Sequence, residues 1–344
     1  MTTKTELGAT YELVTAGLRA IREAHDVLET GKQGTLRAGN TGVVLADGTV
    51  VGKCARLTYL RAIGIDAGDD DASRELMFGA GTSNEDRWYD MLVRGGISPD
   101  RIRRETEIPI IWKTSSGRLV TGRPDLVLVS PGAREQDGTE GVVPERLIEL
   151  KLVSSLWTGR DVLVRGEPKT MHLMQAAHYS WQLGCPGELW YTNRTDFHIP
   201  YGKEWPASGQ PGSEYFQYDK YGKCMKLLPF VVGYSLDWRG GDLYYQRLPS
   251  GQLPAGPWVK SVVTKQGIVD YYELVDGMLA PGTNDLPPRP TNLKPDGSGE
   301  GYDPCSYCPL QSVCDKREGA GKAAWVEEAR RMLALTPATG SVKL

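Results

Sequence analysis

Two apolar runs, separated by a polar and Gly-rich segment, lie between residues 122 and 151. Asp125 precedes an apolar, β-branched run over residues 126–129, which predicts a buried strand. Residues 131–145 are polar and contain several glycines, so they predict a loop. Residues 146–153 form a second apolar run, which we interpret as a second strand.

Charged residues interrupt this second strand in a regular way. Side chains alternate between the faces of a strand, so Glu149 and Lys151 should share one face, while Ile148 and Leu150 should share the other. Burying a carboxylate and an ammonium is costly unless they are paired or functional. A structural ion pair at a strand end explains the pattern if it stands alone. Together with Asp125 on the preceding strand, the pattern favours a metal-dependent site.

The chemistry of these side chains suits phosphate hydrolysis. Two carboxylates give a hard divalent cation, Mg²⁺ or Mn²⁺, the oxygen ligands that it prefers. Such a cation lowers the pKa of bound water and offsets charge on a phosphate. A nearby lysine can orient the water or stabilise the reacting phosphorus. Asp125, Glu149 and Lys151 are therefore chemically sufficient to hydrolyse a phosphodiester.

Other elements follow from the same patterning. Paired strands are predicted over residues 106–112 and 118–129, and helices over 73–92, 168–184, 259–279 and 322–335. In the helix that begins at Pro168, Gln175 and Tyr179 lie four residues apart and therefore on one face. Both can form hydrogen bonds without adding charge, so we expect them to line a substrate path.

A dense group of cysteines lies near the C-terminus: Cys305, Cys308 and Cys314. Thiolates this close together are favourable only around a cation or cluster. A fourth ligand has to come from elsewhere, and we favour Cys54, with Cys185 and Cys224 as alternatives. Four thiolates suit Zn²⁺ or a [4Fe–4S] cluster equally well, and the spacing alone does not separate the two.

Composition narrows the class of protein. With 344 residues, 40% of them hydrophobic, the chain can bury a substantial core. Its formal net charge of −3 argues against binding nucleic acid through bulk positive charge, but is compatible with a local basic groove. No stretch is long and apolar enough to span a bilayer, so we expect no membrane partner. The first residues lack a secretory signal, and the cysteine usage suits a reduced, cytoplasmic setting.

Taken together, these residues resemble the PD-(D/E)xK nuclease superfamily. Asp125, Glu149 and Lys151 match its defining motif, and Gln175 and Tyr179 match a Gln-x3-Tyr motif on the following helix. More narrowly, the chain resembles the RecB-like iron–sulfur exonucleases found with CRISPR adaptation genes and in phages, and the related AddB nuclease domain. The resemblance covers most of residues 37–316, although residues 196–258 match poorly.

The cysteines follow the same family pattern. One cysteine precedes the nuclease core, as Cys54 does, and a C-x2-C-x5-C group follows the core, as Cys305, Cys308 and Cys314 do. The resemblance therefore favours a [4Fe–4S] cluster over Zn²⁺ at these positions. We expect this cluster to be structural, joining the two ends of the nuclease as an iron–sulfur staple.

One position departs from the family pattern. The helix before the core usually carries a metal-binding His, and Glu85 stands there in this chain. Phage λ-type exonucleases use an acid in the corresponding helix, so the resemblance implies that Glu85 joins Asp125 and Glu149 as a metal ligand. Asp86 is the fallback.

The resemblance implies a restriction-endonuclease-like α/β fold, in which a mixed sheet is flanked by helices. Four regions are expected: an N-terminal helical region with the first cluster cysteine over 1–72, the nuclease core over 73–195, a β-rich insertion or extension with a helix over 196–280, and a linker, cysteine cluster and C-terminal helix over 281–344. The implied function is a metal-dependent DNA exonuclease acting on DNA ends or single strands. Recombination, replication or CRISPR-adaptation proteins would be its partners. A non-catalytic DNA-binding or adaptor protein that keeps the same fold is the alternative.

Overall fold

The computed structural model describes most of the chain beyond its first 34 residues. The described residues are 35–65, 72–105, 107–134, 140–153, 161–162, 166–193, 208–210, 213, 216–218, 220–222, 224–227, 231–249, 254–299, 301, 305, 308, 310–317 and 321–335. Much of the helical region expected over residues 1–72 therefore lies outside the described residues. None of the helices in the described ranges is long and apolar enough to cross a membrane.

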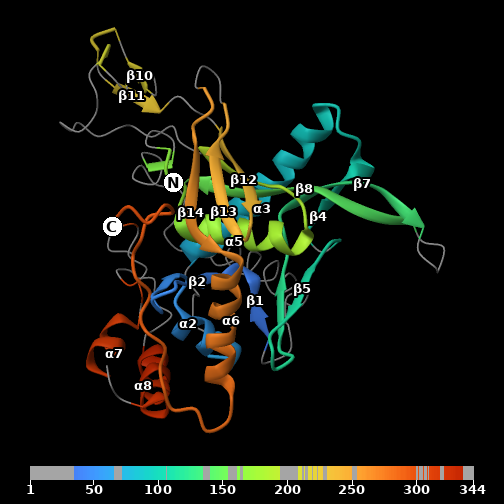
Figure 1. Cartoon of the computed structure of the whole chain (residues 1–344). Coiled ribbons are helices and arrows are strands. Elements are labelled where there is room, and N and C mark those ends of the chain that lie inside the picture. The colour runs from blue at the N-terminus through green and yellow to red at the C-terminus, as the bar shows by residue number, and fades with distance from the viewer. Residues whose placement is uncertain are drawn as a thin grey trace, which may run out of the picture.

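A seven-stranded mixed sheet forms the centre of the fold (Figure 1). Its strand order is β14 (Trp258–Thr264), β13 (Asp242–Arg247), β12 (Val231–Arg239), β9 (Gly187–Asn193), β8 (Glu140–Val153), β7 (Leu126–Arg134) and β4 (Ile102–Arg104). The pair β8–β9 is parallel, and the other neighbouring pairs are antiparallel. This arrangement confirms the coarse expectation of an α/β protein built on a large mixed sheet.

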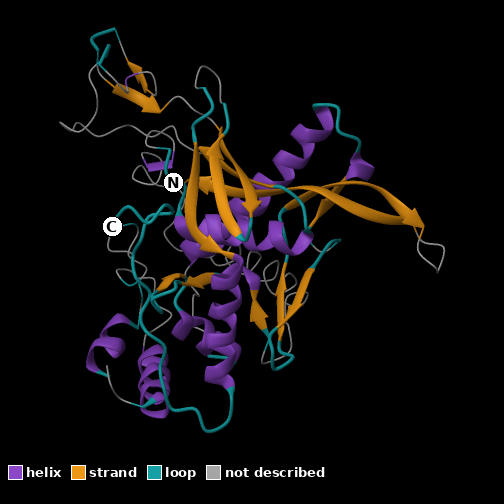
Figure 2. Ribbon diagram, viewed as in Figure 1, coloured by secondary structure: helices purple, strands orange, loops and turns teal. Residues whose placement is uncertain are grey.

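Helices flank the sheet because alternate side chains of its strands are apolar on both faces (Figure 2). Ile148 and Leu150 of β8 pack in a cluster with Trp88, which belongs to α3 (Ala72–Arg94). Leu147 of β8 packs instead in the main core with Leu173, which belongs to α5 (Thr170–Leu183). The helix α5 ends at Gly184 in the left-handed conformation, as a glycine C-cap allows.

A second group of smaller elements, called here the second body, lies below the large sheet in the view of Figure 1. A three-stranded sheet has the order β1 (Leu36–Arg37), β6 (Leu119–Gly122) and β5 (Ile110–Lys113), and a hairpin joins β2 (Gly42–Val44) to β3 (Val50–Gly52). Two further helices, α2 (Ala55–Ala62) and α6 (Lys265–Leu279), pack together here. The hydroxyls of Thr58 and Tyr271 join them at 2.9 Å.

The C-terminal helices pack against this second body (Figure 1). They are α7 (Gln311–Lys316) and α8 (Lys322–Leu335). Lys322 at the start of α8 donates a hydrogen bond to the carbonyl of Met278 at 2.6 Å and lies 5.6 Å above the ring of Tyr59. The end of the described chain therefore lies against α2, which comes early in the sequence.

The Pro- and Gly-rich segment before α7 lies along the body of the protein. The amide of Thr291 donates to the carbonyl of Val50 at 2.6 Å, so the segment pairs with β3. The guanidinium of Arg56 on α2 donates to the carbonyl of Pro287 at 2.8 Å. These contacts guide the chain from α6 towards the cysteines at its C-terminal end.

Several predicted element boundaries are wrong. The strand expected over residues 118–129 is two strands, β6 and β7, which belong to different sheets and are separated by residues 123–125. Much of the loop expected over residues 131–145 is strand, because β7 and β8 continue as a ribbon whose Val143 is 52% exposed. The first part of the helix expected over 259–279 is β14, whose β-branched residues favour a strand.

Gly52, two residues before Cys54, is a position where only glycine fits. Its φ is +94°, and a Cβ placed there would lie 2.3 Å from Met174 Sδ. Gly48 has a similar φ of +84° but open space around it. We therefore expect Gly48→Ala to cost about 1–2 kcal/mol of unfolding free energy from backbone strain alone. Gly52→Ala should cost about 2–5 kcal/mol, because overpacking adds to the strain. Urea denaturation of both variants measures this difference, and equal losses would contradict the packing argument.

Candidate active site and cysteine group

Strand pairing brings Asp125 next to Glu149. Leu126 at the start of β7 pairs with Ile148 of β8, so Asp125 lies across from Glu149 in the antiparallel ladder. The preceding Pro124 is buried. Asp125 Oδ2 accepts a hydrogen bond from the amide of Leu150 at 2.6 Å. This bond fixes the carboxylate against the neighbouring strand.

Lys151 bridges the two carboxylates. Its Nζ donates to Glu149 Oε1 at 2.6 Å and lies 3.9 Å from Asp125 Oδ2. Glu149 is fully buried, and its Oε2 has no hydrogen-bond partner among the described residues. Buried carboxylate oxygens are normally hydrogen-bonded. The unpartnered oxygen therefore needs a physical explanation, and a bound cation would provide one.

Burial and the neighbouring charges together shift the pKa values of Glu149, Asp125 and Lys151. Burial, followed by the charge of Asp125, raises the pKa of Glu149 to about 8. Burial likewise raises the pKa of Asp125. For Lys151, burial opposes the charged form, but the charges of Glu149 and Asp125 outweigh it and hold the pKa of the ammonium above its usual value. A positive charge is thus strongly favoured between the two acids.

A further carboxylate reaches this place from α3. Burial raises the pKa of Glu85 to about 9, and the charges of Asp125, Glu105 and Glu149 add to the effect. Glu85 thus lies within electrostatic reach of the other two acids. The fallback residue, Asp86, is 59% exposed and pairs with Arg104. Of Glu85 and Asp86, Glu85 is therefore the acid that acts electrostatically on Asp125 and Glu149.

Glu105 is a site residue that the sequence did not reveal. It follows β4 and shares a hydrogen bond with the carboxyl of Glu85. Two carboxyl groups can hydrogen-bond only if one holds a proton. The guanidinium of Arg123 lies 3.8 Å from Glu105. No motif marks Glu105, because its approach to Glu85 depends on the packing of β4 beside β7.

Gln175 and Tyr179 also lie at the site, on α5. Gln175 Nε2 donates to the hydroxyl of Tyr179 at 3.3 Å. Tyr179 is only 3% exposed, and burial, followed by the charge of Glu149, holds its pKa well above the usual value. A Cβ on Gly122 would lie 2.7 Å from its ring, so β6 approaches the ring closely. Tyr179 is thus packed in the core with its hydroxyl beside Gln175 and within electrostatic reach of Glu149.

Two basic residues near Lys151 were also missed. His172 on α5 approaches the hydroxyl of Tyr191 through Nδ1 at 3.2 Å. Burial holds its pKa well below the usual value, and the charges of Lys151, Lys53 and Lys169 add to the effect. Burial also lowers the pKa of Lys53 to about 8, and Arg61 and Lys151 lower it further. Neither residue has a motif that sequence patterning could have shown.

The cysteines do not form a close cluster in the described part of the chain. Cys54 immediately precedes α2, at its N-cap position, and its side chain makes no capping hydrogen bond there. Burial raises the pKa of this thiol to about 12, and the charges of Cys308 and Cys314 add to the effect. These three thiols therefore lie within electrostatic reach of one another.

The backbone around Cys308 forms tight turns. The amide of Cys308 donates to the carbonyl of Cys305 at 3.0 Å, and the amide of Gln311 donates to the carbonyl of Cys308 at 3.1 Å. Cys185 lies elsewhere, beside Arg146 after α5, and the side chain of Cys224 lies outside the described residues.

The described side chains that were expected to bind a metal do not converge on one point. Within the described ranges, no group of three or more His, Cys, Asp or Glu side chains is close enough to hold a metal ion. Carboxylate oxygens at one place and thiols at the other are nevertheless the ligands that hard cations and iron–sulfur clusters take. The side chains would have to move closer together to share one ion.

No protein-family model, curated protein or solved structure matches this chain.

The raised pKa of Glu85 gives a test of the acidic site. A carboxyl whose pKa is raised in the folded protein costs stability as the pH rises from about 4.5 to about 9, because the unfolded chain loses that proton first. In metal-free protein at pH 8, Glu85→Gln should therefore raise Tm by several degrees, about 2–4 °C per kcal/mol relieved. At pH 5 the change should be small. A variant that is equally destabilised at both pH values would show that Glu85 is not held among other acids.

Proposed function

We propose that this chain is a divalent-metal-dependent deoxyribonuclease of the RecB-like, iron–sulfur branch of the PD-(D/E)xK superfamily. It hydrolyses phosphodiester bonds at DNA ends or in single strands, as an exonuclease in phage or mobile-element recombination or replication, or in CRISPR adaptation. The observation that carries this proposal is the fully buried Glu149, whose Oε2 lacks a partner in the described structure while Asp125 and Lys151 lie beside it.

The acids would hold Mg²⁺ or Mn²⁺. Asp125, Glu149 and Glu85 offer oxygen ligands, and their mutual repulsion would be relieved by a cation. When bound, the cation activates water and offsets charge on the scissile phosphate. With oxygen ligands only, and no imidazole, the site should favour Mg²⁺.

The other residues position the reacting groups. The ammonium of Lys151 is held by Glu149, so it can orient water and stabilise negative charge on phosphorus. Gln175 and Tyr179 form a neutral hydrogen-bonded pair on the same side of the sheet. An amide at this place can bind the DNA backbone without adding charge.

The cysteines would hold a [4Fe–4S] cluster. The thiols of Cys54, Cys308 and Cys314 lie within electrostatic reach of one another, and Cys305 lies one turn before Cys308. Ligation would tie the start of α2 to the C-terminal segment and close a loop around the whole catalytic sheet, which stabilises the folded state. Zn²⁺ in the same thiolates is the alternative.

The decisive test is cleavage of labelled DNA with and without Mg²⁺ or Mn²⁺. We expect Asp125→Asn and Glu149→Gln to reduce cleavage about 100-fold or more, because charge stabilisation of several kcal/mol is lost with the cation. Glu145→Gln on the same strand, an exposed acid paired with Arg101, is the matched control and should cleave normally. Metal-independent DNA binding without any cleavage by the wild type would instead identify a non-catalytic DNA-binding protein.

A second test concerns the cysteines. Protein purified without oxygen should be brown and contain iron and sulfide. Cys54→Ala should bleach it and lower Tm, whereas Cys185→Ala should keep the colour, because Cys185 lies beside Arg146 in another part of the fold. A colourless, folded protein carrying one zinc would replace the iron–sulfur assignment with a zinc site.

A further inference from the structure

A concentration of positive charge lies beside the acidic site. His172 is within electrostatic reach of three ammonium groups, those of Lys53, Lys151 and Lys169. Lys151 is paired with Glu149, and the ammonium of Lys169 lies 3.5 Å from Asp161. Like charges repel, so this concentration of ammonium groups is favourable only where anionic groups lie nearby, and a bound anion would add to the two acids.

Lys53 differs from the other two lysines in its surroundings. It is half-buried, and no described residue forms a hydrogen bond or ion pair with its ammonium. The charged groups that act on it are Arg61 and Lys151, both cations. A half-buried ammonium surrounded by other cations is costly to desolvate without a partner.

The backbone holds Lys53 in this position. Gly52 approaches α5 so closely that a Cβ there would lie 2.3 Å from Met174 Sδ, and the amide of Lys53 bonds to the carbonyl of Thr41. On its other side, Lys53 is followed by Cys54 at the start of α2. The backbone position of Lys53 is thus set by the packing of Gly52 against α5.

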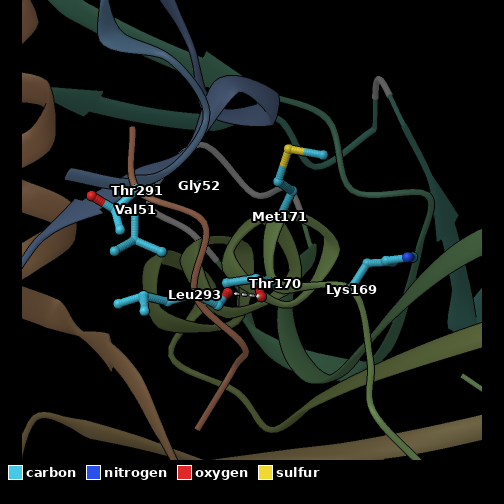
Figure 3. A pocket seen from close by; sticks show the side chains of 7 residues that line it. All are labelled: Val51, Gly52, Lys169, Thr170, Met171, Thr291 and Leu293. Carbon is cyan, nitrogen blue, oxygen red and sulfur yellow. Dashed lines mark hydrogen bonds between the residues drawn. The ribbon is translucent and has the colours of Figure 1, made fainter. Parts of the chain in front are cut away.

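Lys169 approaches from the start of α5. Its amide donates to the hydroxyl of Tyr191 at 3.0 Å, which fixes the backbone at the point where α5 begins. A small pocket lies here, lined by residues from β3, from the start of α5 and from the segment before α7. Figure 3 shows the side chain of Lys169 extending away from Val51 and Leu293 on the far wall of that pocket. Its ammonium lies 3.5 Å from Asp161 and within electrostatic reach of His172.

We propose that Lys53 and Lys169 form a phosphate-binding seat for the substrate strand next to the catalytic centre. This rests on the proposed nuclease function. Lys151 serves the phosphate that is cleaved, and the lysine pair binds a neighbouring phosphate, because a nucleic-acid strand carries one negative charge per nucleotide. Phosphate contacts of this kind fix the register of a strand without reading its sequence. Lys53 and Lys169 are thus positioning residues, and the chain's net charge of −3 is no obstacle to such a local contact.

The test measures binding of a fluorescein-labelled single-stranded oligonucleotide in Ca²⁺, at salt concentrations between 50 and 200 mM, and cleavage kinetics in Mg²⁺. The variants are Lys53→Met, Lys53→Arg and Lys169→Met. Lys260→Met is the control, since Lys260 is 57% exposed and paired with Asp242 at the far edge of the sheet. Thermal unfolding verifies that each variant is folded.

We expect Lys53→Met and Lys169→Met each to weaken binding about 10-fold and to reduce the slope of log K against log salt by about 0.7, the value for one single-strand phosphate contact. KM should rise more than kcat falls. Lys53→Arg should restore binding, because a guanidinium keeps the charge. If Lys53→Met does not fold, Lys169→Met and Lys53→Arg still report on the seat.

The outcomes separate this inference from the proposed function. A wild type that cleaves DNA, together with lysine variants of unchanged affinity and salt slope, overturns the phosphate seat and leaves the nuclease intact. A loss of affinity with an unchanged salt slope also overturns it, because the lysines would then act only through the fold. A wild type that neither binds nor cleaves DNA overturns both.

Discussion

The pairing of β7 with β8 is the interaction on which the candidate site depends. It sets Asp125 across from Glu149 and gives Asp125 an amide partner on Leu150. It also buries Glu149 completely, with Lys151 as the partner of one oxygen and none in the described structure for the other. Carboxylates in a low-dielectric interior raise one another's pKa, so this arrangement stores repulsion that a cation would relieve.

The remaining site residues come from elements that pack on the two faces and at the edge of the sheet, close to the pair of Asp125 and Glu149. Trp88 anchors α3 against β8, which places Glu85 one turn away near the acids. The other face carries α5 with Tyr179, and β4 at the sheet edge contributes Glu105. Acidic and basic groups thus meet here, because Lys151 pairs with Glu149, lies 3.9 Å from Asp125, and is one of the three lysines within electrostatic reach of His172. In the proposed nuclease, a cation and a phosphate would be bound side by side at this place.

The cysteine group and the site are physically connected through a short stretch of chain. Gly52 packs on α5, Lys53 lies within electrostatic reach of Lys151, and Cys54, at the N-cap of α2, lies within electrostatic reach of Cys308. The segment before α7 is paired with β3, so it directs the C-terminal cysteines to this place. A cluster bound by the cysteines would therefore fix the residues that precede Cys54 as well as the ends of the chain.

The sequence by itself determined the mixed α/β class, the helix that carries Gln175 and Tyr179, and the alternation that puts Glu149 and Lys151 on one face of a strand. These follow from local periodicity, which is a property of neighbouring residues. Only the tertiary structure decided that the chain changes sheets between β6 and β7, and that Glu105, Lys53 and His172 join the site. Those residues come from separate elements that approach one another through packing, and long-range packing leaves no periodic signal in the sequence.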